Sequence, residues 1–260
     1  MPIALVTGAD GFIGSRLVEL LVKKGYKIKA LSQYNSFNNW GWIEDIECKD
    51  KVEVLTGDIR DPHYCKSIAK DIDIIFHLAA LIAIPYSYIA PDSYVDTNIK
   101  GTLNICQAAK EHGNIRVIHT STSEVYGTAQ YTPIDEEHPL NAMSPYGQNK
   151  IDIENLIFDN HFFDTRCCTK ILRYFNPVGA YKNGLIGEIP KGIPNNLMPY
   201  LLGVVNGTYP YLQVFGDDYN TNDGTPIRDY IHVMDLVEAH LIALQDNKLG
   251  IDIYNVGNGK

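Results

Sequence analysis

A glycine-rich segment near the N-terminus constrains the fold more than any other feature of the chain. Residues 7–14 (TGADGFIG) follow a short apolar run, Ile3–Thr7, and precede residues whose apolar positions recur at helical spacing. Gly8 permits a tight turn, Gly11 lets a pyrophosphate approach the backbone, and Gly14 lets helix and strand pack closely. Free N–H groups at the start of such a helix face phosphates. The segment predicts a dinucleotide-binding turn, with an ordinary strand–helix turn as the alternative.

The first half of the chain alternates short apolar runs with helical patterns. Nearly continuous apolar strands that alternate with helices indicate an α/β fold with a doubly wound parallel sheet of the Rossmann type. We predict one domain over residues 1–170 and a smaller C-terminal lobe over 171–260, which looks incomplete at its end and returns strands to the first domain. Further strands are expected at Ile28–Leu31, Val52–Leu55, Asp73–His77, Ile115–Thr120 and Lys170–Phe175, with helices that end near Gly25 and span Thr102–His112.

Composition excludes several functional classes. The chain of 260 residues has 31 acidic and 22 basic residues, a net charge of -9, so nucleic-acid binding is not expected. The N-terminus lacks the basic region typical of a signal peptide, and the uncharged run Ile74–Ala90 is shorter than the ~20 residues that a membrane span needs. We therefore expect a cytoplasmic protein without a membrane segment. Neither a disulfide framework nor a metal site fits the five scattered cysteines, Cys48, Cys65, Cys106, Cys167 and Cys168.

A second motif places candidate catalytic residues in the middle of the chain. Tyr146 and Lys150 form a Y-x-x-x-K at the start of a predicted helix, about 24 residues after the segment STSEVYG at 121–127. Residues four apart share a helix face, so the Lys150 ammonium is expected to lower the pKa of the Tyr146 phenol. Tyr146 is then expected to take the proton of a substrate hydroxyl, and Thr122 to hydrogen-bond the same oxygen.

The glycine spacing and this Thr–Tyr–Lys order resemble the extended short-chain dehydrogenase/reductase superfamily, the NAD-dependent epimerases and dehydratases. The expected acidic residue after the second strand is missing, since Ser32 and Gln33 stand there. No arginine replaces it, which favours NAD over NADP. His77 is interpreted as a core histidine. The resemblance implies that the cofactor contacts Gly8, Gly11, Phe12, Ile13, Gly14, Ser32, Asp58, Ile59, Leu78, Ala79, Ala80, Asn98, Tyr146, Lys150 and Tyr174.

Two resemblances meet near residue 147. Residues 1–147 resemble UDP-N-acetylglucosamine 4,6-dehydratases through YNSFNNW at 34–40, AALIAIPYSY at 79–88 and 121–127. Residues 148–260 resemble UDP-glucose 4-epimerases, with the C-terminal part truncated relative to that family. The matching segments are RYFNPVGA at 173–180, GIPNNLMPY at 192–200 and DGTPIRDYIHV at 223–233. Two departures are Ile82, where epimerases place a lysine, and a nucleotide-covering segment that would lie beyond Lys260. The implied substrate contacts are Asn176, Asn195, Asn196, Leu197, Phe215 and Arg228.

Each of these substrate residues also has an ordinary structural interpretation. Asn195 and Asn196 suit a helix cap, and Arg228 suits a surface ion pair with Asp229. The density of matches favours the ligand interpretation.

Both families oxidise carbon 4 of a nucleotide-activated sugar, and they differ in the step that follows. Glu124 stands where dehydratases keep the base that removes the carbon 5 proton, while the later loops resemble those of epimerases. We predict a UDP-glucose 4-epimerase, with a 4,6-dehydratase as the alternative and a non-catalytic NAD- or UDP-sugar-binding protein as a third possibility. The family implies a homodimer through the helices at Thr102–His112 and Tyr146–Phe158.

Overall fold

A parallel seven-stranded sheet forms the centre of the protein. The computed structural model describes residues 1–113, 115–163, 168–181, 184, 186–190 and 192–259. The strand order is β3-β2-β1-β4-β5-β6-β9, and every neighbouring pair is parallel, which confirms the predicted doubly wound fold. The strands are β1 (Ile3–Thr7), β2 (Lys27–Gln33), β3 (Val52–Gly57), β4 (Ile74–His77), β5 (Arg116–Thr122), β6 (Cys168–Tyr174) and β9 (Gly250–Val256), besides the separate pair β7 (Asn176–Val178) and β8 (Tyr230–His232).

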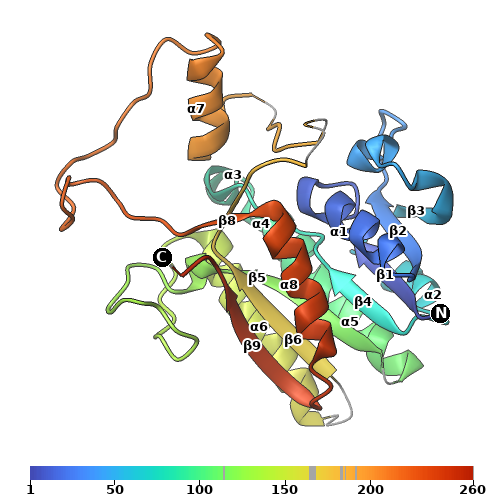
Figure 1. Ribbon diagram of the computed structural model, residues 1–260. Coiled ribbons are helices and arrows are strands. Elements are labelled where there is room, and N and C mark those ends of the chain that lie inside the picture. The colour runs from blue at the N-terminus through green and yellow to red at the C-terminus, as the bar shows by residue number, and fades with distance from the viewer. Residues whose placement is uncertain (114, 164–167, 182–183, 185, 191, 260) are drawn as a thin grey trace.

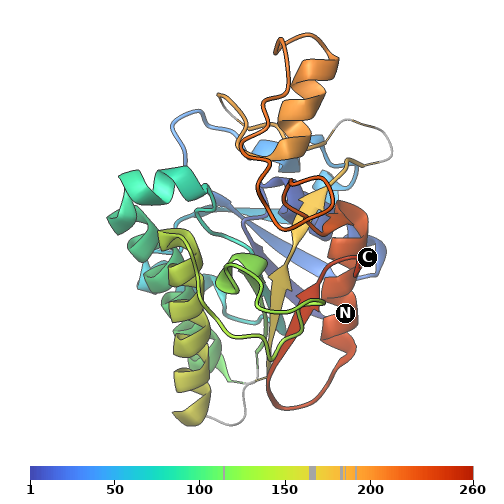
Figure 2. The same cartoon turned by 90° about the vertical axis from the view of Figure 1, so that its left-hand side faces the viewer.

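Helices cover both faces of the sheet (Figures 1 and 2). One apolar core joins α1 and α8 to the sheet, and a second core joins α2 and α5 to the opposite face. Each core is sealed from water because its helix presents an apolar stripe to strands that are apolar on both sides. The helices are α1 (Phe12–Lys23), α2 (Pro62–Ile68), α3 (Ile84–Ile89), α4 (Pro91–Tyr94), α5 (Gly101–His112), α6 (Pro145–Phe163), α7 (Leu197–Val205) and α8 (Val233–Gln245), with a π-helical turn η3 (Val95–Lys100) before α5.

The predicted strands are correct in place, and those at β2, β3 and β5 are too short at their carboxyl ends. β2 continues to Gln33 and β5 to Thr122, beyond the apolar runs from which they were predicted. Gln33 pairs with Gly57, and Thr122 pairs with Tyr174. Backbone hydrogen bonds extend a strand regardless of its side chains. A prediction based on hydrophobicity therefore misses polar residues at the carboxyl edge of the sheet. The predicted boundary at residue 170 falls inside β6, and the division into two domains stays a prediction.

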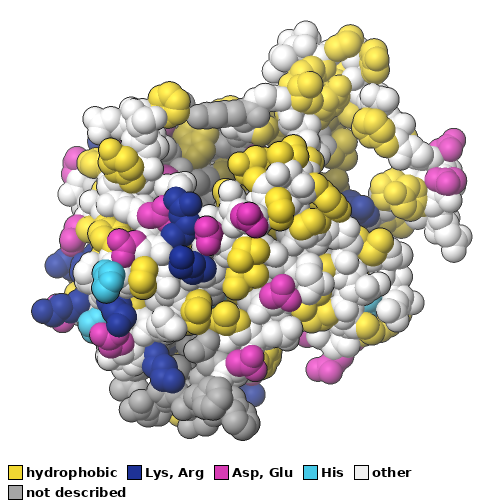
Figure 3. All heavy atoms as spheres, turned by 180° about the vertical axis from the view of Figure 1, so that it is seen from behind, with side chains coloured by type: hydrophobic (Ala, Val, Ile, Leu, Met, Phe, Trp, Pro, Cys, Tyr) yellow, Lys and Arg dark blue, Asp and Glu magenta, His cyan; other side chains and the backbone are white. Residues whose placement is uncertain are grey.

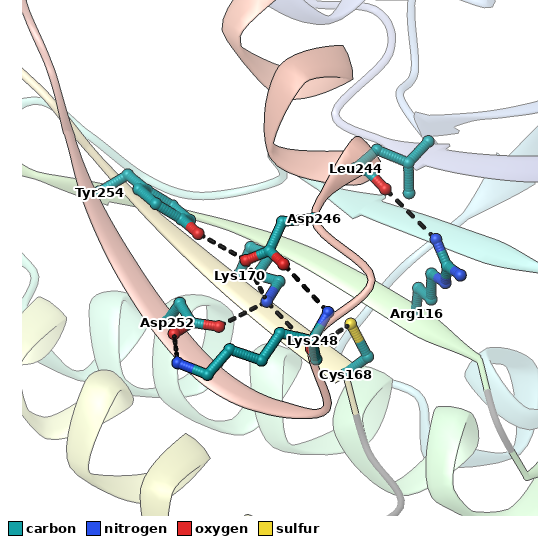
Figure 4. A network of polar contacts seen from close by, with 8 residues as sticks. All are labelled: Arg116, Cys168, Lys170, Leu244, Asp246, Lys248, Asp252 and Tyr254. Atoms are coloured by element: carbon teal, nitrogen blue, oxygen red, sulfur yellow. Dashed lines mark hydrogen bonds and ion pairs between the residues drawn. The ribbon is translucent and has the colours of Figure 1, made fainter.

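A polar network fastens the last strand to the sheet (Figure 4). Lys170 on β6 is buried, and its ammonium donates to Asp246 at 2.9 Å and to Asp252 at 2.5 Å. Asp246 also accepts a hydrogen bond from the Tyr254 hydroxyl at 2.7 Å. Two carboxylates and a carbonyl oxygen of Lys248 thus satisfy the buried ammonium, which would otherwise be costly to desolvate.

Acid is expected to loosen this attachment of β9. The hydrogen bond from Tyr254, and next the Lys170 ammonium, hold the pKa of Asp246 well below its usual range. A carboxylate with a lowered folded-state pKa contributes stability above its unfolded pKa of about 3.9, and that stability is lost as the pH falls through the folded value. Urea unfolding between pH 7 and about pH 2 should therefore show a smaller loss for Asp246→Asn than for the wild type. Identical pH profiles would contradict this role of Asp246.

Several negative observations apply to the part of the chain that is described. No helix there is long and apolar enough to cross a membrane. No group of three or more histidine, cysteine or acidic residues is arranged there to hold a metal ion. Cys48, Cys65, Cys106 and Cys168 are thiols, and Cys167 lies outside the described residues.

Candidate active site

The three glycines of the 7–14 turn have different structural roles. Gly8 has φ +67°, and a Cβ there would lie 2.8 Å from the backbone nitrogen of Ala79. A Cβ at Gly14 would lie 2.1 Å from the Gly8 carbonyl oxygen. Gly11 has φ -81° and ψ 171°, which any residue adopts, and its Cβ would meet only the Gly8 carbonyl oxygen, at 3.3 Å. Protein packing demands glycine at positions 8 and 14, whereas open space in front of Gly11 fits the approach of a pyrophosphate.

The start of α1 provides the second part of an anion site. Gly11 is its N-cap, no side chain caps the first turn, and that turn contains no acidic residue. The first N–H groups of a helix lack partners within the helix and carry a partial positive charge. This donor set suits the diphosphate of a dinucleotide.

Replacing Gly11 by valine is expected to abolish NAD binding and to leave the fold intact. The β-branched side chain would fill the open space in front of the turn, and it would meet no more than one carbonyl oxygen of the protein. Isothermal calorimetry with NAD gives the affinity, and circular dichroism with urea unfolding checks the fold. Gly187→Val is a matched control, since a Cβ there would make only an ordinary contact, at 3.8 Å from Ala180. Unchanged NAD affinity in Gly11→Val would remove the turn from the cofactor site.

The structure brings Thr122, Glu124 and Tyr146 together at the carboxyl end of β5. Thr122 ends the strand, and its hydroxyl accepts a hydrogen bond from the Glu124 backbone N–H at 3.2 Å. The Thr122 side chain also lies close enough to the Tyr146 phenol to oppose the rise in its pKa. Gly147 allows this arrangement, because a Cβ there would lie 2.9 Å from the Glu124 carbonyl oxygen. The first turn of α6 is thereby pressed against the end of β5.

The prediction that Lys150 lowers the pKa of Tyr146 is wrong when only the groups of the protein are considered. Burial, and next the charge of Glu124, raise the pKa of Tyr146, because a phenolate among apolar neighbours and a carboxylate is poorly solvated. The Lys150 ammonium donates to the carbonyl oxygen of Thr120 at 2.8 Å. Burial lowers the pKa of Lys150 to about 8, and the charge of Glu154 opposes that change. Formation of the phenolate therefore requires positive charge beyond that of Lys150.

A buried network behind the catalytic helix was missed by the sequence reasoning. Glu154 accepts hydrogen bonds from the Ser121 hydroxyl at 2.5 Å and from the Arg173 guanidinium at 2.6 Å. Tyr146, Lys150 and Glu154 are spaced by four residues, so they share one face of α6. That spacing was the available signal, although nothing in the sequence identified Arg173 as the partner. The network fixes α6 to β5 and β6, the two strands that end at the site.

The expected cofactor residues lie at the carboxyl ends of β1 to β6, and several have their polar groups engaged. The Asn98 amide clamps Leu81, accepting from its N–H at 2.8 Å and donating to its carbonyl oxygen at 2.9 Å. Tyr174 is buried, and its hydroxyl lies 2.5 Å from His240 Nε2. These two residues shape the walls of the site. Gly8, Phe12, Ile13, Asp58, Leu78, Ala79 and Ala80 are half-buried, Gly14, Ser32 and Ile59 are buried, and Gly11 is exposed.

His77 is confirmed as a core histidine. Its Nδ1 lies 2.8 Å from the Thr7 hydroxyl oxygen and its Nε2 lies 2.9 Å from the Thr102 hydroxyl oxygen. Burial, and next the charge of Lys150, lower its pKa to about 3. A neutral histidine with both nitrogens engaged has no proton to exchange near neutral pH, which agrees with the absence of a catalytic role.

The expected substrate residues lie on segments that extend outward from the sheet. The side-chain amide of Asn176 on β7 donates to the Asp229 carbonyl oxygen at 2.8 Å, which places Arg228 near the start of β8. Asn196 occupies the N-cap of α7 without capping it and hydrogen-bonds Glu188 instead. The carboxylate of Asp229 accepts from backbone N–H groups of Asn258 and Gly259, not from Arg228.

Apolar side chains gather on this outer region. α7 stands above the carboxyl edge of the sheet in both ribbon views, and the segment after it swings away from the body (Figures 1 and 2). The space-filling view shows hydrophobic side chains on this projecting part (Figure 3). Phe215 is 81% exposed, and Asn195, Asn196, Leu197 and Arg228 are exposed as well. Their assignment to the substrate stays a prediction.

A doubly wound parallel sheet with a glycine turn at β1 and a Thr–Tyr pair at β5 defines a dinucleotide-dependent enzyme of the dehydrogenase type. The chain belongs to the NAD dependent epimerase/dehydratase family, whose sequence pattern matches residues 4–257. It is 40% identical to the UDP-glucose 4-epimerase of Bacillus subtilis (strain 168), over 98% of this chain and 77% of that protein. It is 39% identical to UDP-glucose 4-epimerase 1 of Oryza sativa subsp. japonica, over 98% and 75%.

Solved structures of UDP-glucose 4-epimerases also match nearly the whole chain. The UDP-glucose 4-epimerase of Stenotrophomonas maltophila with bound NAD and formylated UDP-arabinopyranose aligns with a TM-score of 0.92 and 38% identity, over 100% of this chain and 79% of that one. The UDP-glucose 4-epimerase of Bifidobacterium longum in complex with NAD+ and UDP aligns with a TM-score of 0.89 and 38% identity, over 99% and 78%. These matches include the first 147 residues, whose motifs resemble dehydratases.

Proposed function

We propose that this protein is an NAD-dependent UDP-glucose 4-epimerase, which interconverts UDP-glucose and UDP-galactose through transient oxidation at carbon 4. The juxtaposition of Thr122 and Tyr146 at the end of β5, on the same edge of the sheet as the glycine turn that follows β1, is the observation that carries the proposal. The names of the relatives support the substrate, since epimerases of this kind match nearly the whole chain. A 4-keto sugar held in one pocket needs only to turn over and accept hydride on its other face.

The protein supplies proton transfer and orientation. The glycine turn and the start of α1 would hold NAD, which would supply reversible hydride transfer at carbon 4. Tyr146 takes the proton of the 4-hydroxyl and later gives it back, while Thr122 holds the same oxygen. Because burial raises the pKa of Tyr146, proton removal by this phenol depends on added positive charge, which oxidised NAD would supply when bound. The buried Lys150 adds a second positive charge on the same helix face.

Uridine diphosphate is the nucleotide that we expect this site to prefer. Arg228 lies exposed beside β8, and among the described residues its guanidinium hydrogen-bonds only the neighbouring carbonyl oxygen of Ile227, at 2.9 Å. Arg228→Ala should weaken UDP binding by about 10- to 100-fold, the range for a hydrogen bond to a charged group. A thermal-shift titration with UDP and GDP measures both affinity and base preference. Equal protection by the two nucleotides would overturn the assignment.

Glu124 favours dehydration as the second candidate function. Its carboxylate is half-buried and close enough to Tyr146 to influence the pKa of that phenol. A carboxylate beside a 4-keto sugar can remove the acidic carbon 5 proton, which starts the loss of water in a 4,6-dehydratase. The resemblance of residues 1–147 to dehydratases agrees with that role.

Product analysis distinguishes the two reactions. The protein is incubated with UDP-glucose and with UDP-N-acetylglucosamine, and the products are analysed by mass spectrometry and chromatography. Epimerisation leaves the mass unchanged, whereas dehydration removes one water. A water-loss product that disappears in Glu124→Gln would refute the epimerase proposal. Absence of any turnover, with NAD and UDP both bound, would support the third possibility of a non-catalytic binding protein.

The quaternary arrangement belongs to the same proposal. We expect a homodimer through α5 and α6, and Phe158 on α6 is 43% exposed, which supports an apolar contact there. Light scattering after size-exclusion chromatography measures the mass of the assembly. The two-domain division at residue 170 and the cytoplasmic location stay predictions.

A further inference from the structure

The end of β2 lacks the acidic residue that holds the adenosine ribose in this fold, but a carboxylate nevertheless lies there. Asp10, which precedes Gly11 in the glycine turn, accepts hydrogen bonds at Oδ2 from the Ser32 hydroxyl at 3.3 Å and from the Gln33 backbone N–H at 3.2 Å. Ser32 is fully buried. The carboxylate therefore comes from the glycine turn and is held against the two residues that end β2.

The backbone around Asp10 is fixed from two sides. The Ala9 N–H donates to the Leu31 carbonyl oxygen at 3.2 Å, which ties the turn to β2. The Trp42 N–H donates to the Asp10 carbonyl oxygen at 3.0 Å, and a Cβ on Gly41 would lie 2.6 Å from that same oxygen. Asp10 is thus positioned before any ligand binds, as a specificity residue requires.

Among the described residues, the charge of Asp10 has no counterion. Within the described residues Asp10 forms no ion pair, and the sequence from Ser32 to Trp42 contains no lysine or arginine. Burial raises the pKa of Asp10, which shows that holding this carboxylate here costs free energy. An ionised carboxylate has about four acceptor sites, so two hydrogen bonds from β2 leave capacity for further donors.

We propose that Asp10 is the residue that binds the adenosine ribose and selects NAD over NADP. Its carboxylate accepts the vicinal ribose hydroxyls, and its charge repels a 2′-phosphate at the same place. Ser32 and the Gln33 N–H act as positioning groups, which explains a buried serine where the acid normally stands. This inference rests on the proposed NAD-dependent function and deepens it by naming the determinant of cofactor choice.

The experiment measures cofactor affinity rather than turnover. Fluorescence titrations with NADH and NADPH are made on the full-length wild type, Asp10→Asn and Asp71→Asn. Asp71 is a matched control, since it is exposed and has φ +62°, a conformation that asparagine tolerates. We expect Asp10→Asn to bind NADH about 10- to 100-fold more weakly and to lose most of its discrimination against NADPH, while Asp71→Asn matches the wild type.

A second variant keeps the test decisive where Asp10→Asn folds poorly. Asp10→Ser combined with Ser32→Asp moves the carboxylate onto β2 and should restore the preference for NADH. An unchanged ratio of NADH to NADPH affinity in Asp10→Asn would overturn the role of Asp10 while leaving the epimerase proposal intact. A wild type that binds neither dinucleotide would contradict both.

Discussion

Replacing Tyr146 by phenylalanine is expected to lower kcat by about 10²- to 10⁴-fold, the usual contribution of a positioned acid–base group. The ring of Tyr146 is buried and packs edge-on against Tyr94 at 6.4 Å between ring centroids, so a phenyl ring preserves the packing. Loss of the hydroxyl removes the phenol that lies beside Thr122 and with it the proposed proton acceptor for the sugar. Interconversion of UDP-glucose and UDP-galactose, followed by a coupled assay, gives kcat, and calorimetry shows whether NAD still binds.

Tyr94→Phe is the matched control for this prediction. Tyr94 is also buried, and its hydroxyl donates to the Ala83 carbonyl oxygen at 2.5 Å. Removal of that bond should cost about 1 kcal/mol of stability and leave kcat within a few-fold of the wild type. Comparable losses of kcat in the two variants would indicate that position 146 acts through packing. A kcat for Tyr146→Phe close to the wild-type value would refute its role as the base.

Breaking the buried pair behind the catalytic helix is expected to be the most damaging change for stability. Glu154→Gln would leave the Arg173 guanidinium, which is 3% exposed, without its carboxylate. Loss of one partner of a buried ion pair typically costs about 3–5 kcal/mol. The charge that sustains the protonated form of Lys150 would disappear as well, so the pKa of Lys150 should fall further. Urea unfolding gives the stability, and the pH dependence of kcat reports on Lys150.

An exposed pair provides the comparison. Lys66 and Glu111 lie 2.6 Å apart with side chains 45% and 52% exposed, so water and salt screen their attraction. Glu111→Gln should leave the unfolding curve and the pH profile unchanged. A Glu154→Gln protein as stable as Glu111→Gln would show that the network does not hold α6 in place.

At the end of β2, a residue from a neighbouring segment lies where the expected acidic residue is missing. Ser32 occupies the position of the missing acid, and the sequence favoured NAD only because no arginine stood there. The turn supplies Asp10 at that position, because Ala9 pairs with Leu31 at the end of β2. Residues 10 and 32 are separated by a whole helix, and only the parallel pairing of β1 with β2 makes them neighbours.

The sequence by itself determined the parallel sheet and the glycine turn, and it singled out Tyr146 as the candidate catalytic tyrosine. These features depend on local order: apolar runs that form strands, a strand that ends at Gly8, and a Y-x-x-x-K at the start of a helix. Each of these features depends on residues that are close in the chain, so their spacing can be read directly from the sequence. The family then supplied the expectation of NAD and a UDP-sugar.

The tertiary structure alone decided the electrostatics of the site and the partners of its buried groups. Sequence spacing predicted that Lys150 lowers the pKa of Tyr146, but burial and Glu124 raise it, since desolvation depends on everything packed around a group. Arg173 meets Glu154, and Asp10 meets Ser32, across elements that are distant in the chain. A spacing rule describes one helix or one strand, whereas burial and long-range pairing exist only once the sheet has assembled.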